Sequence, residues 1–142
     1  METQGGFLIT QVKQVGSRVF EKILSDADIQ EFNGAQGKIL YVLWQEDGIA
    51  INTLAKRVGL ANTTLTSMLD RMETAELIRR VPDERDRRKS RIVLTAKARA
   101  LQDKYDAVSD KMNALYYVGF SQAEIQQFEN YLRRILKNLE GC

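Results

Sequence analysis

The stretch of sequence that decides the fold runs from Ile51 to Thr95 and reads INTLAKRVGLANTTLTSMLDRMETAELIRRVPDERDRRKSRIVLT. A short helical pattern over residues 52–58 ends at Gly59, and a second helical pattern follows over residues 62–75. Two short apolar runs, 77–81 and 90–94, flank a charged loop over residues 82–89. The stretch therefore predicts two helices joined by a glycine turn and followed by a β-hairpin.

The second of these helices has two different faces. Its apolar residues recur at the spacing i, i+3, i+4, i+7, so one stripe faces a core; they are Leu65, Met68, Leu69 and Met72. The opposite side carries Thr63, Ser67, Asp70 and Thr74, flanked by Thr64, Thr66 and Arg71. Hydroxyl groups suit phosphate oxygens and base edges, and threonine methyl groups suit the thymine methyl group. The alternative is an ordinary solvated helix face.

The hairpin has a basic tip. Between residues 79 and 91 there are seven basic and three acidic residues, and the bases are Arg79, Arg80, Arg85, Arg87, Arg88, Lys89 and Arg91. Arginine is the side chain expected where a narrow minor groove or a phosphate is bound. Asp83 and Asp86 are expected to pair with nearby guanidinium groups and hold the loop in one shape. The alternatives are a solvated charged hairpin and a basic tag read by a carrier.

Helix, glycine turn, helix and basic hairpin form the layout of a winged helix-turn-helix. In that module the second helix enters the major groove of DNA and the hairpin, or wing, lies near the minor groove. The predicted fold class is mainly α with a small β wing, with further helices at both ends of the chain.

These residues resemble the MarR family of bacterial transcription regulators. The resemblance covers residues 32–95 by motif: Phe32 to Gln36, Leu54-Ala55, Val58 to Leu60, Thr64 to Thr66, Leu69 to Glu73, Leu77 to Arg80, Asp83 to Arg88, and Ile92 to Thr95. It implies a homodimer that binds a near-palindromic operator in double-stranded DNA, usually as a repressor, and is released by a small molecule or by an oxidised cysteine.

The resemblance also assigns contacts to DNA by position. Thr63, Thr64, Thr66 and Ser67 would enter the major groove, Arg71 would reach the backbone, and the wing would contribute Arg85, Arg87, Arg88 and Lys89, with Arg87 or Arg88 in the minor groove. The chain departs from the family where Ser67 replaces a common basic residue. It departs again where Ala61 replaces a common capping serine, which leaves Asn62 as the candidate cap.

Charge is unevenly distributed along the 142 residues. The whole chain carries a net charge of +2, whereas residues 51–91 hold ten basic and six acidic residues. The positive charge thus lies on the proposed DNA-reading module, as binding to phosphates requires. No apolar run of 18 residues occurs, and residues 1–6 lack the basic start of a signal peptide, so we expect a cytoplasmic protein without a membrane segment.

Residue usage argues against an enzyme. The chain has no histidine and one cysteine, Cys142. Catalysis through Ser-His-Asp or Cys-His groups is therefore excluded, and we expect no metal site and no cofactor. Gly34 to Lys38 superficially suggests a phosphate loop but lacks the required spacing and the Ser or Thr after the lysine. A single cysteine rules out an internal disulfide and fits a reducing compartment.

Helical patterns also flank the central stretch. They cover residues 7–24, residues 33–45 with Asn33 as cap, residues 95–117 with Thr95 as cap, and a last helix opened by the capping box Ser121 to Glu124. The two C-terminal helices have coiled-coil spacing, which predicts a helical dimer interface; packing within one chain is the alternative. We expect one protomer over residues 1–142, with a DNA-binding lobe at about 33–95 and a dimerisation lobe at about 6–26 and 96–140.

Two further expectations concern ligands and partners. The resemblance implies a small aromatic or lipophilic effector, with Phe20, Tyr41 and Trp44 as candidate lining residues and Arg18 or Lys38 as partners for a carboxylate. Plain core packing is the alternative for these aromatic residues. The rival to the DNA-binding function is a winged-helix module that binds an acidic protein through its basic hairpin.

Overall fold

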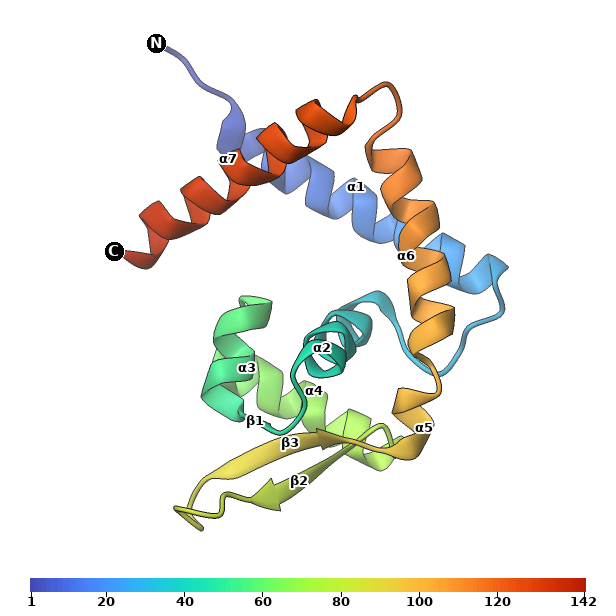
Figure 1. Cartoon of the computed structure of the whole chain (residues 1–142), viewed down its shortest axis with the longest axis vertical. Helices are drawn as coiled ribbons and strands as arrows, with labels where there is room; N and C mark the ends of the chain where they lie inside the picture. Colours follow the sequence, from blue (N-terminus) through green and yellow to red (C-terminus); the bar gives the residue numbers. More distant parts are fainter.

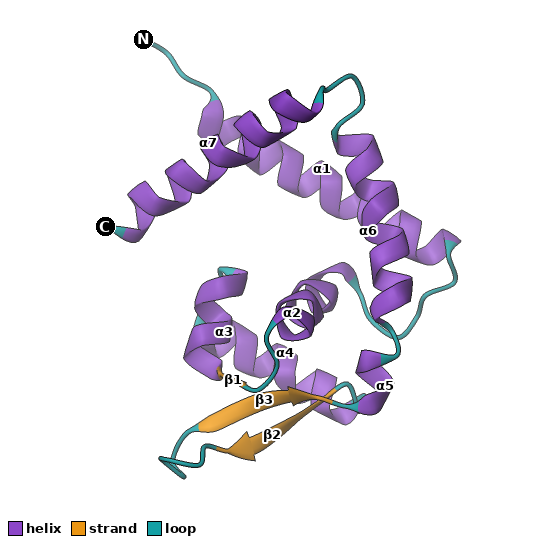
Figure 2. Ribbon diagram, in the orientation of Figure 1, coloured by secondary structure: helices purple, strands orange, loops and turns teal.

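The computed structural model describes all 142 residues, and the chain forms seven helices and three short strands (Figures 1 and 2). The elements are α1 (Gly5–Asp26), α2 (Gly34–Gln45), β1 (Ile49–Ala50), α3 (Ile51–Val58), α4 (Asn62–Thr74), β2 (Ile78–Pro82), β3 (Ser90–Leu94), α5 (Ala96–Arg99), α6 (Gln102–Tyr116) and α7 (Gln122–Glu140). This mainly helical fold with one small sheet confirms the predicted fold class.

Helices α3 and α4 form the predicted helix-turn-helix. Helix α3 ends at Gly59, whose φ of 74° lies in the left-handed region that glycine adopts without strain. Leu65, Leu69 and Met72 of α4 are fully buried, as the apolar stripe predicts. This burial orients α4 and leaves its polar side on the surface.

The sheet has the strand order β1-β3-β2 and is antiparallel throughout (Figure 2). Asp47, just before β1, fixes one edge of the sheet, since its Oδ1 accepts hydrogen bonds from the backbone of Gly48 and Leu94 and its Oδ2 lies 2.7 Å from Nη2 of Arg99. Strand β1 is therefore held against β3, and it joins the wing to the end of α2.

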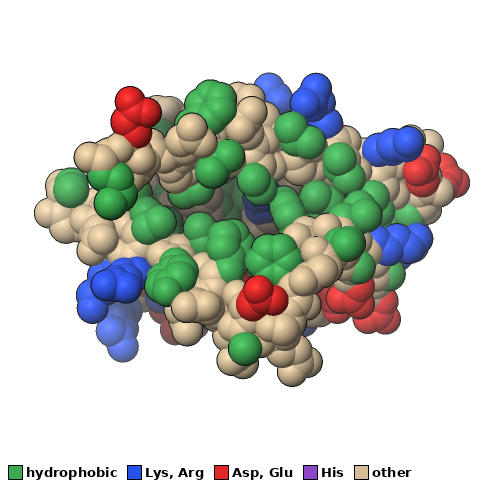
Figure 3. All heavy atoms as spheres, turned by 90° about the horizontal axis from the view of Figure 1, so that it is seen from above, with side chains coloured by type: hydrophobic (Ala, Val, Ile, Leu, Met, Phe, Trp, Pro, Cys, Tyr) green, Lys and Arg blue, Asp and Glu red, His purple; other side chains and the backbone are tan.

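One hydrophobic core serves the lower part of the molecule in Figure 1, where α2, α3 and α4 lie over the sheet and α6 leads away from it. Helix α7, in contrast, contains no buried residue. Apolar side chains gather on the face of the molecule shown in Figure 3. In the chain as a whole, the large apolar side chains that are more than 40% exposed include Phe7, Leu8, Val12 and Val15 of α1 and Phe128, Tyr131, Ile135 and Leu139 of α7.

The structure corrects three details of the sequence-based expectations. Asn62 does not cap α4: the helix begins at this residue, after Ala61, and has no side-chain cap. The expected single helix over residues 95–117 is divided, because the backbone N–H of Leu101 bonds to Ala98 O, three residues earlier, and closes a tight turn between α5 and α6. The coiled-coil spacing of the expected helix over residues 95–117 comes from Leu101, Tyr105, Val108, Met112 and Leu115. The first four are buried within their own chain and are not free for a partner, whereas Leu115 near the end of α6 is 55% exposed.

The predicted caps elsewhere are present. Asn33 and Ser121 each form a complete capping box with Gln36 and Glu124, and the hydroxyl of Thr95 accepts a hydrogen bond from the backbone of Ala98. None of the helices is long and apolar enough to span a bilayer.

Candidate nucleic-acid interface

The outward side of α4 presents the predicted polar residues. Thr63, Thr64, Thr66, Ser67 and Arg71 are all exposed, whereas the apolar stripe of the same helix is buried. Since the helix is anchored on one side only, its other side forms a continuous polar surface.

The hydroxyl groups on this surface differ in what they can donate. Thr66 Oγ1 donates to Asn62 O at 2.8 Å, and Thr74 Oγ1 donates to Asp70 O at 3.0 Å. A hydroxyl has one hydrogen, so these two groups can only accept a further hydrogen bond. Thr63, Thr64 and Ser67 make no such bond and remain able to donate.

At the base of the wing loop, Asp83 organises the backbone. Its Oδ1 accepts hydrogen bonds from the backbone N–H of Arg85 at 2.8 Å and of Asp86 at 3.4 Å, and its Oδ2 lies 3.0 Å from Nε of Arg91. Arg91 Nη1 in turn donates to Gly48 O at 2.8 Å, which ties β3 to the start of β1. The Arg85 backbone hydrogen bond is the main reason that the pKa of Asp83 lies below its ordinary value, and Asp86 and Arg91 add to it.

Asp86 has a comparable role at the tip. Its Oδ1 accepts from Nε of Arg88 at 3.2 Å and from the backbone N–H of Arg88 at 3.1 Å. These two hydrogen bonds, the side-chain one first, lower the pKa of Asp86. The Arg88 side chain is nevertheless 92% exposed. Arg85, Arg87 and Lys89 are also exposed, and their side chains form no ion pair within the chain. The tip thus has a shaped backbone and a positive surface.

The residues expected to form an effector pocket do not all come together. Arg18 and Lys38 are exposed, whereas the rings of Phe20, Tyr41 and Trp44 surround that of Tyr105 with centroid separations of 6.1, 6.1 and 5.2 Å. Burial is the main reason that the pKa of Tyr105 is raised. The sequence predicts Tyr105 only as part of the coiled-coil spacing of the helix over residues 95–117. It does not reveal Tyr105 as the centre of this aromatic group, because Trp44, Tyr41 and Phe20 lie 61, 64 and 85 positions away in the chain.

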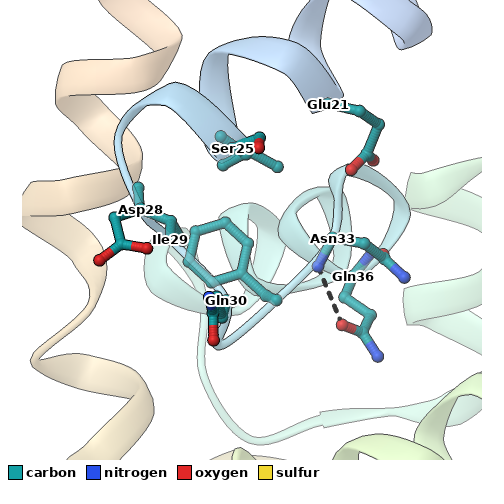
Figure 4. A pocket seen from close by; sticks show the side chains of 9 residues that line it. Glu21, Ser25, Asp28, Ile29, Gln30, Asn33 and Gln36 are labelled. Atoms are coloured by element: carbon teal, nitrogen blue, oxygen red, sulfur yellow. Dashed lines mark hydrogen bonds between the residues drawn. The ribbon is translucent and has the colours of Figure 1, made fainter.

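Two recesses of the surface lie away from these aromatic residues. A cavity of about 380 Å³ between the end of α1 and the start of α2 is lined mainly by polar residues (Figure 4). In it, Asn33 N donates to Gln36 Oε1, and a Glu21 carboxylate oxygen accepts from Gly34 N. A second cavity of about 450 Å³ lies beside α4, β2 and α5 and includes Glu73, Arg79 and Lys97. Neither contains any of the five predicted pocket residues. The chain also has no group of three or more His, Cys, Asp or Glu residues placed to hold a metal ion.

A helix-turn-helix whose second helix is followed directly by an antiparallel hairpin defines the winged helix-turn-helix class. Residues 32–90 match the sequence model of the MarR family. The HTH-type transcriptional regulator TtmR of Methylorubrum extorquens (strain PA1) is 31% identical over 108 residues, which make up 76% of this chain and 54% of TtmR. This chain thus spans about half the length of that relative.

Solved structures agree with this assignment. A mutant MarR from E. coli complexed with operator DNA has a TM-score of 0.80 and 26% identity, with 92% of each chain covered. The PcaV regulator of Streptomyces coelicolor, solved in complex with its natural ligand, has the same fold, with a TM-score of 0.79, 21% identity and 96% of each chain covered. The chain described here belongs to the MarR family.

Proposed function

We propose that this protein is a dimeric, sequence-specific DNA-binding transcription regulator that acts as a repressor. The observation that carries the proposal is the wing tip, where two aspartates hold the loop and leave Arg85, Arg87 and Lys89 unpaired and exposed. The polar side of α4 is a second exposed surface of the same module. The operator complex of the E. coli MarR mutant supports the assignment, as does the description of TtmR as a transcriptional regulator.

The contacts follow from the exposed surfaces. Thr63, Thr64, Thr66 and Ser67 of α4 read base edges in the major groove, and Arg71 binds the backbone. Arg85, Arg87, Arg88 and Lys89 bind phosphates or the minor groove. In this proposal residues 33–95 form the DNA-binding lobe, and residues 6–26 and 96–140 form the lobe that joins two protomers.

Dimerisation explains the apolar surface of α1 and α7 (Figure 3). A soluble monomer rarely exposes so many large apolar side chains together, whereas a second copy would cover them. Two α4 helices related by a two-fold axis would then read half-sites about 34–36 Å apart, which is one turn of the duplex. Selection of bound sequences from random duplex DNA tests this directly: we expect a palindrome, and enrichment of no sequence would contradict the proposal.

Arg88→Ala tests the wing. The variant lacks one cationic side chain that would contact a phosphate or the minor groove. The slope of the logarithm of the DNA association constant against the logarithm of the salt concentration should therefore become less steep by about 0.9, while the protein stays folded and dimeric. Fluorescence anisotropy at several salt concentrations measures the slope. Lys22→Ala on α1 is the matched control, since Lys22 is exposed but lies on a helix assigned to dimerisation. An unchanged slope for Arg88→Ala would contradict the wing contact.

The same titration addresses the alternative of an acidic protein partner, which neither the family nor the relatives favour. A steep salt dependence on duplex DNA supports the DNA-binding function. Retention on DNA that does not depend on salt would favour the protein-binding alternative.

We also propose that a small aromatic or lipophilic acid regulates the protein by binding at the aromatic group around Tyr105, with Arg18 or Lys38 near its carboxylate. The support is that Tyr41, although part of this group, is 48% exposed, so a ligand can reach it. Trp44 is the only tryptophan, and its fluorescence reports on this group. Calorimetry and Trp44 fluorescence with a set of phenolic acids test the proposal; no heat and no spectral change with any of them would leave core packing as the explanation.

A further inference from the structure

Arg80 lies on the inner face of the wing and not on the outer face that its sequence neighbours occupy. Successive residues of a strand point to opposite faces of the sheet. Ile78, two residues earlier, is fully buried, and Ile92, the cross-strand partner of Arg80, is fully buried as well. Arg80 therefore points to the side of the sheet covered by α4, whereas Arg79 points away from it.

The Arg80 side chain contacts three residues of α4 that are spaced about one helical turn apart. Its Nη2 lies 2.7 Å from Oδ1 of Asp70 and 3.3 Å from the backbone oxygen of Thr66, and its Nη1 lies 2.8 Å from Oε1 of Glu73. The backbone N–H of Arg80 also donates to Oε2 of Glu73 at 3.2 Å. The Arg80 side chain is 22% exposed, compared with 92% for Arg88 at the wing tip.

These contacts reduce the negative charge on the exposed side of α4, the surface proposed to face DNA. Asp70 and Glu73 are carboxylates on the exposed side of α4, where they would repel the phosphates of a bound duplex. One guanidinium between them removes part of that negative charge. It does so with two nitrogen atoms in a fixed plane, a geometry that the single ammonium group of lysine does not provide.

The same contacts fix the helix in position. Thr66, Asp70 and Glu73 are spaced i, i+4 and i+7, so they form one stripe of α4 two turns long. A rotation of α4 about its axis, or a shift along β2, would break at least one of the hydrogen bonds to Arg80. The residues that face the DNA, including Ser67 between Thr66 and Asp70, would move with it.

We propose that Arg80 is a positioning residue of the DNA-reading surface: it holds α4 at a set orientation against the wing and masks Asp70 and Glu73, without contacting DNA itself. This inference rests on the proposed DNA-binding function.

The test compares Arg80→Gln with Arg79→Gln, which removes the same charge from the other face of the same strand. Binding is measured by anisotropy on two probes, a duplex selected from random DNA by the wild-type protein and a scrambled duplex of the same composition. For Arg80→Gln we expect the ratio of the two affinities to fall about tenfold, the effect of losing one good base contact. Arg79→Gln should leave this ratio unchanged.

Two further variants separate charge from position. Arg80→Gln combined with Asp70→Asn and Glu73→Gln removes the unmasked carboxylates, so affinity for the scrambled duplex should return at least to the wild-type value while the ratio stays low. Arg80→Lys keeps the charge without the planar fork, so the ratio should lie between those of the wild type and Arg80→Gln. If the combined variant instead binds the scrambled duplex weakly, and the salt slope has fallen by about 0.9, Arg80 is a phosphate contact and the proposal is wrong.

A measurement without DNA keeps this inference distinct from the proposed function. Amide hydrogen exchange in α4 should be several times faster in Arg80→Gln than in the wild type or in Arg79→Gln, whereas α6 should not change. Unchanged exchange in α4 would overturn the positioning role, whatever the protein binds. Absence of salt-dependent DNA binding by the wild type would contradict the proposed function instead, with the exchange rates still deciding whether Arg80 holds α4.

Discussion

The acidic residues of the wing illustrate how a single side chain contributes to a surface of the opposite charge. Asp83 and Glu84 are neighbours with the same charge, yet Asp83 accepts hydrogen bonds from the loop backbone and from Arg91, whereas Glu84 is exposed and makes no hydrogen bond. Removal of either carboxylate makes the tip more positive. Electrostatics alone therefore predicts tighter DNA binding for both changes, and a structural role predicts the opposite for Asp83.

We expect Asp83→Ala to weaken DNA binding several-fold, because the loop loses the acceptor that shapes it. Glu84→Ala should leave binding unchanged or strengthen it slightly. Anisotropy titrations at one salt concentration measure both. Equal strengthening by the two changes would show that Asp83 does not organise the wing.

At the scale of elements, the turn between α6 and α7 has an unusual tyrosine. The Tyr117 hydroxyl donates to Oε2 of Glu129 at 2.7 Å, and its ring packs against Phe120 and Phe128. Burial, followed by the Glu129 hydrogen bond, raises the pKa of Tyr117 to about 12. The neutral phenol therefore stabilises the folded turn fully below a pH of about 10, the ordinary tyrosine pKa, and this stabilisation is lost as the pH rises toward 12.

A spectrophotometric titration of the tyrosines should accordingly contain one group that ionises well after the others. The late step should disappear in Tyr117→Phe. In Glu129→Gln it should move to lower pH, since the neighbouring negative charge is gone. If the late step persists in Tyr117→Phe, another tyrosine is responsible and the assignment to this turn is wrong.

Helix packing makes a second prediction at this scale. A Cβ atom on Gly37 of α2 would lie 2.9 Å from a ring carbon of Tyr105 and 3.4 Å from the ring of Phe32. Gly37→Ala should therefore destabilise the fold by about 1–3 kcal/mol through overpacking. Gly6→Ala in α1, where no atom lies within 4 Å, should be neutral or stabilise the helix by up to about 1 kcal/mol. Chemical denaturation measures the free energy of unfolding of both variants. Equal changes in the two would show that α2 and α6 move apart to accommodate the added methyl group without loss of stability.

At the scale of the whole molecule, the proposed dimer makes a clear prediction. Ile135 and Leu139 of α7 are 41% and 63% exposed in the single chain. Ile135→Glu should give a monomer, because a carboxylate buried in an apolar interface without a partner is strongly unfavourable. Lys137→Glu, on the charged side of the same helix, is the control. Sedimentation measures the state, and a dimer that persists in Ile135→Glu would place the interface elsewhere.

Much of the fold was predictable because its signals are local. The helix period, Gly59 as a helix end, and the caps at Asn33 and Ser121 each depend on residues within about one or two turns of each other. The charge pattern of the wing is local as well, since the tip residues and the aspartates that bind them are at most eight positions apart. The family resemblance rests on this same continuous stretch.

The amino-acid sequence by itself determined the helix-turn-helix, the wing and the two faces of α4, since periodicity and turn chemistry act over short distances. Only the tertiary structure decided which arginine of the Arg79-Arg80 pair turns inward to Asp70 and Glu73, and that Tyr105 gathers aromatic rings from α1 and α2. The physical reason is that the residues near a charged group or an aromatic ring in the sequence do not identify a partner that is distant in the chain. Which groups meet depends on how the strands and helices pack, and that packing brings together residues as far apart as Phe20 and Tyr105.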